Sequence, residues 1–215
     1  MGARGQRPPI GLIMRTVPSN ASLHDATVVL DDRVILRTVN VIVGPGLTVV
    51  RGPNGSGKTT LLRALAGLVP LARGDRRVAG DILYIGHRPM LLRGLTAREN
   101  LEFFVRFRGG DTRGIDGALR GWGIGEEMDR PVERLSAGER RRAALARVET
   151  EPVGVLLLDE PFADLDDAGA SRLRQTIARV RDDGRSVVVA THAHPELDDI
   201  AGAQIALDDG VARAA

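Results

Sequence analysis

Residues 52–59 read GPNGSGKT, and this segment is the strongest indication of the fold. It matches the glycine-rich phosphate-loop pattern, and it lies between a run with strand character, LTVV, and a run with helical spacing, LLRALAGL. Glycines let backbone N–H groups turn toward phosphate oxygens, and the N-terminus of the following helix favours an anion. We expect the phosphates of a nucleotide to be held by Gly52, Pro53, Asn54, Gly55, Ser56, Gly57, Lys58, Thr59 and Thr60.

Lys58 is the only lysine of the chain, and every other basic position apart from the histidines is arginine. A lysine supplies a compact point charge, whereas the guanidinium of arginine is broad and planar. The composition therefore indicates that this position needs an ammonium group, which we expect to reach the terminal phosphates. The hydroxyl of Thr59 is expected to be a ligand of Mg²⁺.

Composition limits the possible classes of protein. A chain of 215 residues with 43% apolar residues can form one folding unit with a sizeable core. The pI of about 9.8 exceeds what a net charge of +2 suggests, because arginines stay protonated to high pH. The pI therefore says little about partners. The runs Arg140-Arg141-Arg142 and Arg76-Arg77 have no interleaved aromatic residues, so they are interpreted as solvated helix faces, and no nucleic-acid partner is expected. The absence of cysteine is compatible with the cytoplasm.

The chain divides into an extension and one domain. Residues 1–22 are rich in Gly, Pro and Arg and show no periodicity, so we expect a flexible extension without a signal peptide. Residues 23–215 are expected to form a single domain. No stretch approaches the roughly 18 apolar residues that a membrane-spanning helix needs. Any attachment to a membrane is expected to depend on other subunits.

Periodicity places strands and helices around the loop. Strands are expected from Ala26 up to the loop, and DILYIG and SVVVA are expected to be strands beyond it. Thr96-Ala-Arg-Glu predicts a capping box at the start of a helix that continues to Arg108, and Ser136 is expected to cap a helix reaching Arg147. A helix over 167–181, a short helix near Glu196 and a hairpin at 208–210 complete the pattern.

The run VGVLLLD is apolar up to its last residue, which is typical of a strand covered on both faces of a parallel sheet. Two acids, Asp159 and Glu160, stand at its end. Ligands of open α/β sheets bind at the carboxyl ends of the strands. Asp159 is therefore expected to hold Mg²⁺, through water, and Glu160 to accept a proton from, or to orient, the water that attacks the γ-phosphate.

Residues 26–212 together resemble an ABC-type nucleotide-binding domain. Ser136, Ala137, Gly138 and Glu139 follow Leu135 in a segment similar to the LSGGQ signature of that family. The resemblance implies that this signature acts in trans on ATP bound to an opposing subunit. It also implies that Asp166 lies in the D-loop at the dimer interface, and that His192 contacts the γ-phosphate and orients the attacking water.

The family resemblance also implies the architecture. The fold is expected to be an α/β P-loop NTPase of the RecA-like type, with a parallel-sheet core, an antiparallel β subdomain and an inserted α-helical subdomain. The core is expected over about residues 23–86 and 150–215, and the helical subdomain over about 87–149.

Two positions depart from the family pattern. Arg88 stands where the Q-loop glutamine is expected, and a guanidinium cannot coordinate Mg²⁺. It could neutralise phosphate charge or face outward. Near Leu30 the aromatic that stacks on adenine is missing, so apolar contact is expected to hold the base.

Within the family, the chain resembles the haem-exporter ATP-binding subunits of bacterial cytochrome c maturation, the CcmA family. This resemblance rests on residues 84–89, 95–101 and 135–142 and on Asp159-Glu160-Pro161-Phe162. It implies an ATPase dependent on ATP and Mg²⁺ at the cytoplasmic face of the bacterial inner membrane. The expected partners are a second copy or a homologous ATPase subunit and integral membrane permease subunits.

Three other functions remain open on sequence grounds. The chain could be the ATPase of another ABC exporter, for drugs or lipids. It could be a soluble ABC ATPase acting on nucleic acid, although it has neither a fused second domain nor a long insertion. Arg88 and the missing aromatic also allow a nucleotide-gated assembly module with little turnover.

Overall fold

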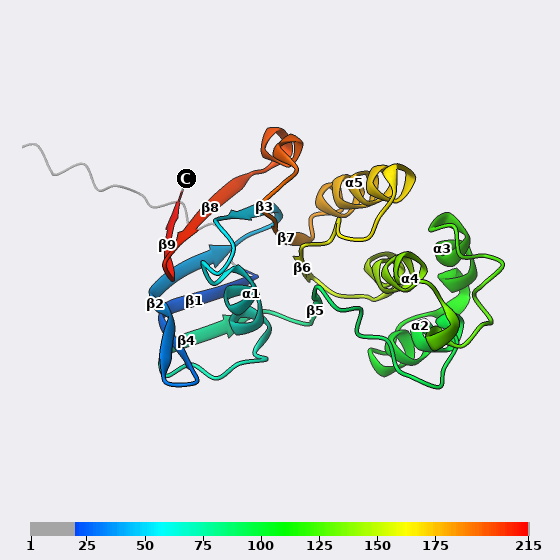
Figure 1. Cartoon of the computed structure of the whole chain (residues 1–215), viewed down its shortest axis with the longest axis horizontal. Helices are drawn as coiled ribbons and strands as arrows, with labels where there is room; N and C mark the ends of the chain where they lie inside the picture. The colour runs from blue at the N-terminus through cyan, green and yellow to red at the C-terminus, as the bar shows by residue number, and fades with distance from the viewer. Residues whose placement is uncertain (1–19, 215) are drawn as a thin grey trace, which may run out of the picture.

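The computed structural model describes residues 20–214, which form two sheets and several helices (Figure 1). The larger sheet has six strands in the order β5-β6-β7-β3-β8-β9, parallel from β5 to β8 with β9 antiparallel at one edge. Its strands are β3 (Gly46–Arg51), β5 (Ile82–Ile85), β6 (Val155–Asp159), β7 (Ser186–Ala190), β8 (Ala203–Asp208) and β9 (Val211–Ala214).

The smaller sheet is antiparallel, in the order β2-β1-β4, and consists of β1 (Ala21–Leu30), β2 (Arg33–Val43) and β4 (Arg73–Val78). Strand β1 begins at Ala21, so the last two residues of the predicted extension, 21 and 22, belong to the sheet, and residues 1–19 lie outside the described part of the chain. Arg76 and Arg77 belong to β4, so the prediction that they lie on a helix is wrong. The strand escaped prediction because its sequence, RGDRRV, is almost entirely polar.

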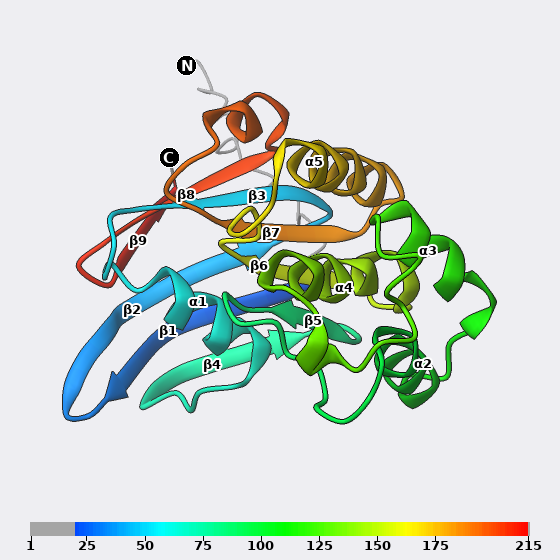
Figure 2. The same cartoon turned by 45° about the vertical axis from the view of Figure 1, so that its right-hand side comes forward.

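The six-stranded sheet is apolar on both faces because helices and the second sheet cover it. Along β6, Leu156 and Leu158 face one hydrophobic core, whereas Val155 and Leu157 face the other. Helix α1 (Lys58–Ala66) packs in the second core, between the two sheets (Figure 2). This alternation explains why VLLLD shows no polar positions before its last residue.

The remaining helices cover the first core. They are α2 (Ala97–Phe107), α3 (Ile115–Gly121), α4 (Ala137–Thr150) and α5 (Asp167–Asp182), with 3-10 turns η1 (Thr112–Gly114), η2 (Val132–Arg134) and η3 (Pro195–Ile200). Helices α2, α3 and α4 contact one another and form a lobe beside the sheet (Figures 1 and 2). The predicted capping box of α2 is confirmed, since Thr96 and Glu99 exchange side-chain and backbone hydrogen bonds.

The predicted α/β class is confirmed, with a parallel core, an antiparallel sheet and an all-helical lobe. Within residues 20–214, no helix is both long and apolar enough to cross a membrane. The carboxyl ends of β3, β7 and β6 lie next to one another in the sheet, because β7 pairs with both of its neighbours. The segments that follow these three strands carry the candidate site.

Candidate nucleotide-binding and hydrolysis site

The loop between β3 and α1 depends on glycine at two positions. Gly57, which precedes α1, has φ 103°, a left-handed conformation that side chains rarely adopt. Gly52 has φ 156°, and a Cβ there would lie 2.1 Å from the carbonyl oxygen of Leu207. The loop therefore passes close to β8. Helix α1, which follows the loop, directs its free N-terminal N–H groups toward it.

Lys58 lies at the first position of α1 and is only 7% exposed. Its Nζ donates hydrogen bonds to the carbonyl oxygens of Gly52 at 2.8 Å and Pro53 at 3.0 Å. The ammonium group is thus held across the loop, with no carboxylate within 4.0 Å among the described residues. This arrangement leaves a positive charge available to an anion.

Asp159 ends β6 and is buried. Its Oδ2 accepts a hydrogen bond of 3.2 Å from the hydroxyl of Tyr84, whose pKa is raised mainly by burial. Its Oδ1 is buried and has no hydrogen-bond partner in the described structure, and the same is true of Ser56 Oγ in the loop. Unpartnered buried oxygens are costly unless something binds them. Carboxylate and hydroxyl oxygens fit the hard ligands that Mg²⁺ prefers.

Glu160 stands one residue beyond the strand in an unusual backbone conformation, with φ 45°. Its N–H donates to the carbonyl oxygen of Ala190 at 2.8 Å, and its Oε1 lies 2.9 Å from Nδ1 of His192. Because β6 and β7 are parallel neighbours, residues 32 positions apart in the chain meet at the same sheet edge. A carboxylate and an imidazole at this distance can share or transfer a proton.

The segment that carries His192 is held by Arg51, which sequence reasoning missed. The guanidinium of Arg51 donates to the carbonyl oxygens of Thr191, Ala193 and His194 and to the carboxylate of Asp198. Arg51 is the last residue of β3, within reach of the end of the neighbouring strand β7, but its partners are mostly backbone carbonyl oxygens, which give no signal in the sequence. Arg51 thereby ties the segment after β7 to the start of the phosphate loop.

Ser136 caps α4, as predicted, and forms a capping box with Glu139. Its Oγ accepts from Glu139 N at 3.2 Å, and its own N–H donates to Glu139 Oε2 at 2.6 Å. The backbone hydrogen bond from Ser136 lowers the pKa of Glu139. Ser136 and Ala137 are exposed, and Gly138 lies close to Asp164, where a Cβ would be 3.2 Å from the carbonyl oxygen.

The signature helix and the phosphate-loop helix pack on opposite faces of the large sheet. The buried residues of α1 belong to the core between the sheets, whereas those of α4 belong to the core under the helical lobe. Asp166 caps α5, accepting from Gly169 N at 2.7 Å, and its side chain is 66% exposed. Arg88 is exposed in the segment after β5.

The prediction that Arg140, Arg141 and Arg142 form a solvated helix face is wrong for Arg141. This side chain is fully buried and donates hydrogen bonds to carbonyl oxygens at the ends of β5 and β6. Its partners are backbone atoms distant in sequence, so a run of three arginines gives no sign of them. Arg140 and Arg142 are partly exposed.

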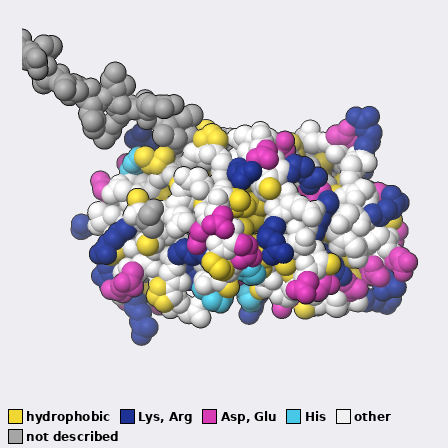
Figure 3. All heavy atoms as spheres, turned by 90° about the horizontal axis from the view of Figure 1, so that it is seen from above, with side chains coloured by type: hydrophobic (Ala, Val, Ile, Leu, Met, Phe, Trp, Pro, Cys, Tyr) yellow, Lys and Arg dark blue, Asp and Glu magenta, His cyan; other side chains and the backbone are white. Residues whose placement is uncertain are grey.

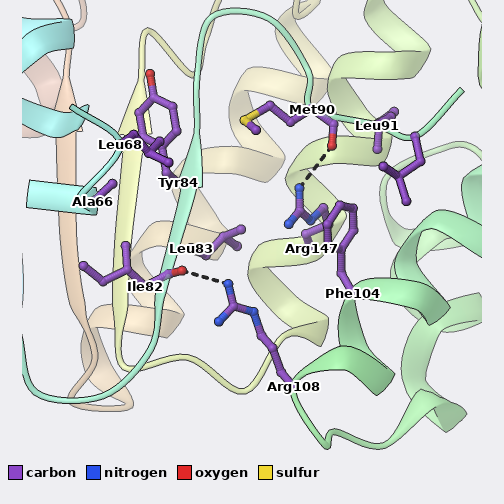
Figure 4. A pocket seen from close by; sticks show the side chains of 11 residues that line it. Ala66, Leu68, Ile82, Leu83, Tyr84, Met90, Leu91, Phe104, Arg108 and Arg147 are labelled. Atoms are coloured by element: carbon purple, nitrogen blue, oxygen red, sulfur yellow. Dashed lines mark hydrogen bonds between the residues drawn. The ribbon is translucent and has the colours of Figure 1, made fainter. Parts of the chain in front are cut away.

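A separate apolar groove of 490 Å³ lies between the core and the helical lobe, and residues 90–92 of the segment after β5 form one of its walls (Figure 4). Its walls include Leu68, Met90 and Phe104. The guanidinium of Arg147 stacks 3.6 Å from the centre of the Phe104 ring. Arg147 also contacts Glu151, a buried carboxylate that pairs with Arg108 as well.

Comparison with known proteins agrees with this geometry. The family described as ABC transporter matches residues 36–163. The chain is 45% identical over 152 residues to the cytochrome c biogenesis ATP-binding export protein CcmA of Paracoccus denitrificans, covering 68% of this chain and 70% of that protein. It is 36% identical over 177 residues to the protein of that name from Gluconobacter oxydans, covering 82% of both.

Solved structures share the fold. An ATP-binding subunit of an ABC transporter superimposes with a TM-score of 0.83 at 20% identity, covering 90% of this chain and 88% of that chain. A dimeric post-hydrolysis state of an ATP-binding cassette bound to ADP and Pi gives 0.82 at 23% identity, covering 91% and 97%. Because the family match spans more than half of the chain and the CcmA relatives match it over most of their length, the chain belongs to the ABC transporter family, as an ATP-binding and ATP-hydrolysing subunit.

Proposed function

We propose that this chain hydrolyses ATP for an export complex of cytochrome c biogenesis, of the haem-export type, with Glu160 and His192 acting on the attacking water. The observation that carries the proposal is the contact of 2.9 Å between Glu160 Oε1 and His192 Nδ1, at the sheet edge next to the phosphate loop. The names of the relatives, cytochrome c biogenesis ATP-binding export proteins, support this biological setting.

The phosphate groups of ATP fit the loop from Gly52 to Thr60, where backbone N–H groups and the ammonium of Lys58 neutralise negative charge. Thr59 and Asp159 would hold Mg²⁺, with Asp159 acting through water. The unpartnered Oδ1 of Asp159 supports this assignment. The cation would offset charge on the β- and γ-phosphates.

Glu160 accepts the proton of the attacking water, or orients that water, while His192 keeps its ring toward Glu160 and contacts the γ-phosphate. Arg51 holds the carbonyl oxygens on both sides of His192, so the imidazole is positioned before nucleotide binds. Proton acceptance by a carboxylate and charge neutralisation by Lys58 together supply the two main requirements of phosphoryl transfer to water.

The site is completed by a second copy of the chain or a homologous subunit. Ser136, Ala137, Gly138 and Glu139 lie at the N-terminus of a helix on the opposite face of the sheet from α1. Such a terminus suits a γ-phosphate presented by another subunit. The exposed Asp166 would lie at the same interface. ATP is then held between two subunits, and hydrolysis releases them.

Integral membrane subunits are the other proposed partners, and they would place the chain at the cytoplasmic face of the inner membrane. The apolar groove lined by Met90 and Phe104 offers a surface for a segment of such a subunit (Figure 4). Nucleic acid is not a proposed partner, and on the face shown in Figure 3 basic side chains are interspersed with acidic ones instead of forming a basic patch.

Affinity purification of the tagged chain from membranes tests this function. We expect ATPase activity together with copurified integral membrane proteins of cytochrome c biogenesis. Met90→Glu puts a charge into the apolar groove, and it should lower the amount of copurified membrane subunit by about tenfold. Ile42→Glu is a matched control, because Ile42 is 58% exposed against 54% for Met90 but lies on β2.

Other results would favour the alternatives. Copurification of a drug or lipid permease would replace the cytochrome c assignment by another export function. Hydrolysis stimulated by nucleic acid would favour a soluble ATPase. Nucleotide-dependent assembly with negligible turnover would favour a gated assembly module.

Arg88 offers a separate prediction about coupling to the membrane subunits. If arginine at this position limits turnover, Arg88→Gln should raise partner-stimulated hydrolysis by roughly twofold or more, because an amide oxygen can reach the metal and a guanidinium cannot. The measurement is the ATPase rate of the reconstituted complex, with and without membrane subunits. Equal stimulation of the variant and the parent would mean that the exposed loop works differently here.

A further inference from the structure

Arg141 is the buried arginine of α4, and all four of its hydrogen bonds go to backbone carbonyl oxygens. Nε donates to Pro161 at 3.2 Å, Nη1 to Gly86 at 2.6 Å, and Nη2 to Asp159 at 3.3 Å and Glu160 at 2.7 Å. Three of these acceptors are consecutive residues at the end of β6. The planar fork of the guanidinium therefore follows the turn that carries Glu160.

The burial of this charge calls for an explanation, since buried cations are normally paired with a carboxylate. Among the described residues, no carboxylate oxygen lies within 4.0 Å of the guanidinium. Burial lowers the pKa of Arg141, and the nearby charges of Asp164, Asp159 and Glu160 oppose that effect. Arginine stays protonated in proteins, so a permanent positive charge lies behind the acidic end of β6.

The turn itself needs support. Glu160 has φ 45°, in the left-handed region that residues other than glycine seldom occupy, and a proline follows it. Such a conformation persists where surrounding contacts fix it. The N–H of Glu160 is fixed by Ala190, and its carbonyl oxygen is fixed by Arg141. With both ends of the residue held, its side chain projects toward His192.

We propose that Arg141 is a positioning residue for Glu160, holding the turn after β6 so that the carboxylate stays against His192. The proposal rests on the hydrolytic role proposed for Glu160. Arg141 belongs to the helix that starts at the signature residue Ser136, and it also holds Gly86, two residues before Arg88. A movement of α4 against the sheet would thus shift both the turn and the Arg88 segment.

Steady-state ATPase kinetics of Arg141→Met tests the proposal. Methionine fills much of the space but donates no hydrogen bond, so the carbonyl oxygens of the turn lose the donor that holds them in place. We expect kcat to fall by about tenfold to a hundredfold, because a small misplacement of a reacting group has effects of that order. KM for ATP should change by less than about twofold, since the phosphate loop is untouched.

Arg185→Met is the matched control. Arg185 also donates to three carbonyl oxygens, those of Val153, Val148 and Glu151, near the opposite end of the strands. Its replacement removes a comparable set of hydrogen bonds and should lower Tm similarly, with kcat within about twofold of the parent. Equal kcat in Arg141→Met and Arg185→Met would overturn the proposal.

Two further variants extend the test, and the first of them, Arg141→Lys, keeps it decisive if Arg141→Met folds poorly. Arg141→Lys keeps the positive charge but not the planar guanidinium that binds several carbonyl oxygens at once, and we expect its kcat to lie between those of the parent and Arg141→Met. In a Glu160→Gln background, Arg141→Met should lower the residual rate no further, because its effect passes through Glu160. An additional loss there would show that Arg141 acts elsewhere. A parent chain that hydrolyses no ATP would instead reject the proposed function itself.

Discussion

Glu160→Gln should lower the rate of phosphate release roughly a hundredfold to ten-thousandfold while leaving ATP binding intact. The amide has nearly the same shape as the carboxylate but cannot accept the proton of water. The contact of 2.9 Å with His192 can persist as a hydrogen bond, so the site keeps its geometry. ATP bound between two subunits then stays unhydrolysed, and a dimer should accumulate in size-exclusion chromatography with ATP.

Glu196→Gln supplies a closely matched control for this variant. Glu196 Oε1 lies 3.1 Å from Nδ1 of His194, which reproduces the pairing of a glutamate with a histidine two residues beyond His192. This substitution should change turnover by no more than about twofold. Phosphate release by Glu160→Gln at the rate of the parent would contradict the role assigned to Glu160.

Lys58→Ala should weaken ATP binding by about tenfold to a hundredfold, because hydrogen bonds to a charged group contribute about 1.5–3 kcal/mol. Lys58→Arg should also fail to restore binding. The side chain is only 7% exposed, and its compact ammonium fits between the carbonyl oxygens of Gly52 and Pro53. A guanidinium is broader and planar, although the rest of the chain uses arginine almost everywhere.

Titration with a fluorescent ATP analogue gives the dissociation constants, and the rise in Tm with Mg-ATP gives an independent measure. Arg77→Ala removes the same charge from an exposed position on β4 and should leave ATP affinity unchanged. Should Lys58→Arg bind ATP as tightly as the parent, the requirement for a compact ammonium would be refuted.

Local patterns predicted much of this fold and site. The phosphate loop, the capping box of α2, the Ser136 cap of α4 and the acidic end of β6 depend on residues close together in sequence, and the structure has them where the spacing indicates. The run VLLLD was informative because both faces of its strand are covered.

Contacts between distant backbone atoms could not be predicted. Arg141 and Arg51 bind backbone carbonyl oxygens, and because every residue has one, the sequence does not indicate which of them an arginine will contact. The φ of 45° at Glu160 likewise depends on what surrounds it, since glutamate has no preference for that conformation. Strand β4 was missed for another reason, because it pairs through its backbone while its side chains face water.

Strand β4 has a consequence for the subunit before it meets its partners. It is an edge strand of the antiparallel sheet, and most of its side chains are charged, namely those of Arg73, Asp75, Arg76 and Arg77. An exposed edge strand can pair with strands of other chains, which leads to aggregation, and charged side chains oppose such pairing. The charged side chains of β4 therefore oppose edge-to-edge pairing of subunits and the aggregation that such pairing would start.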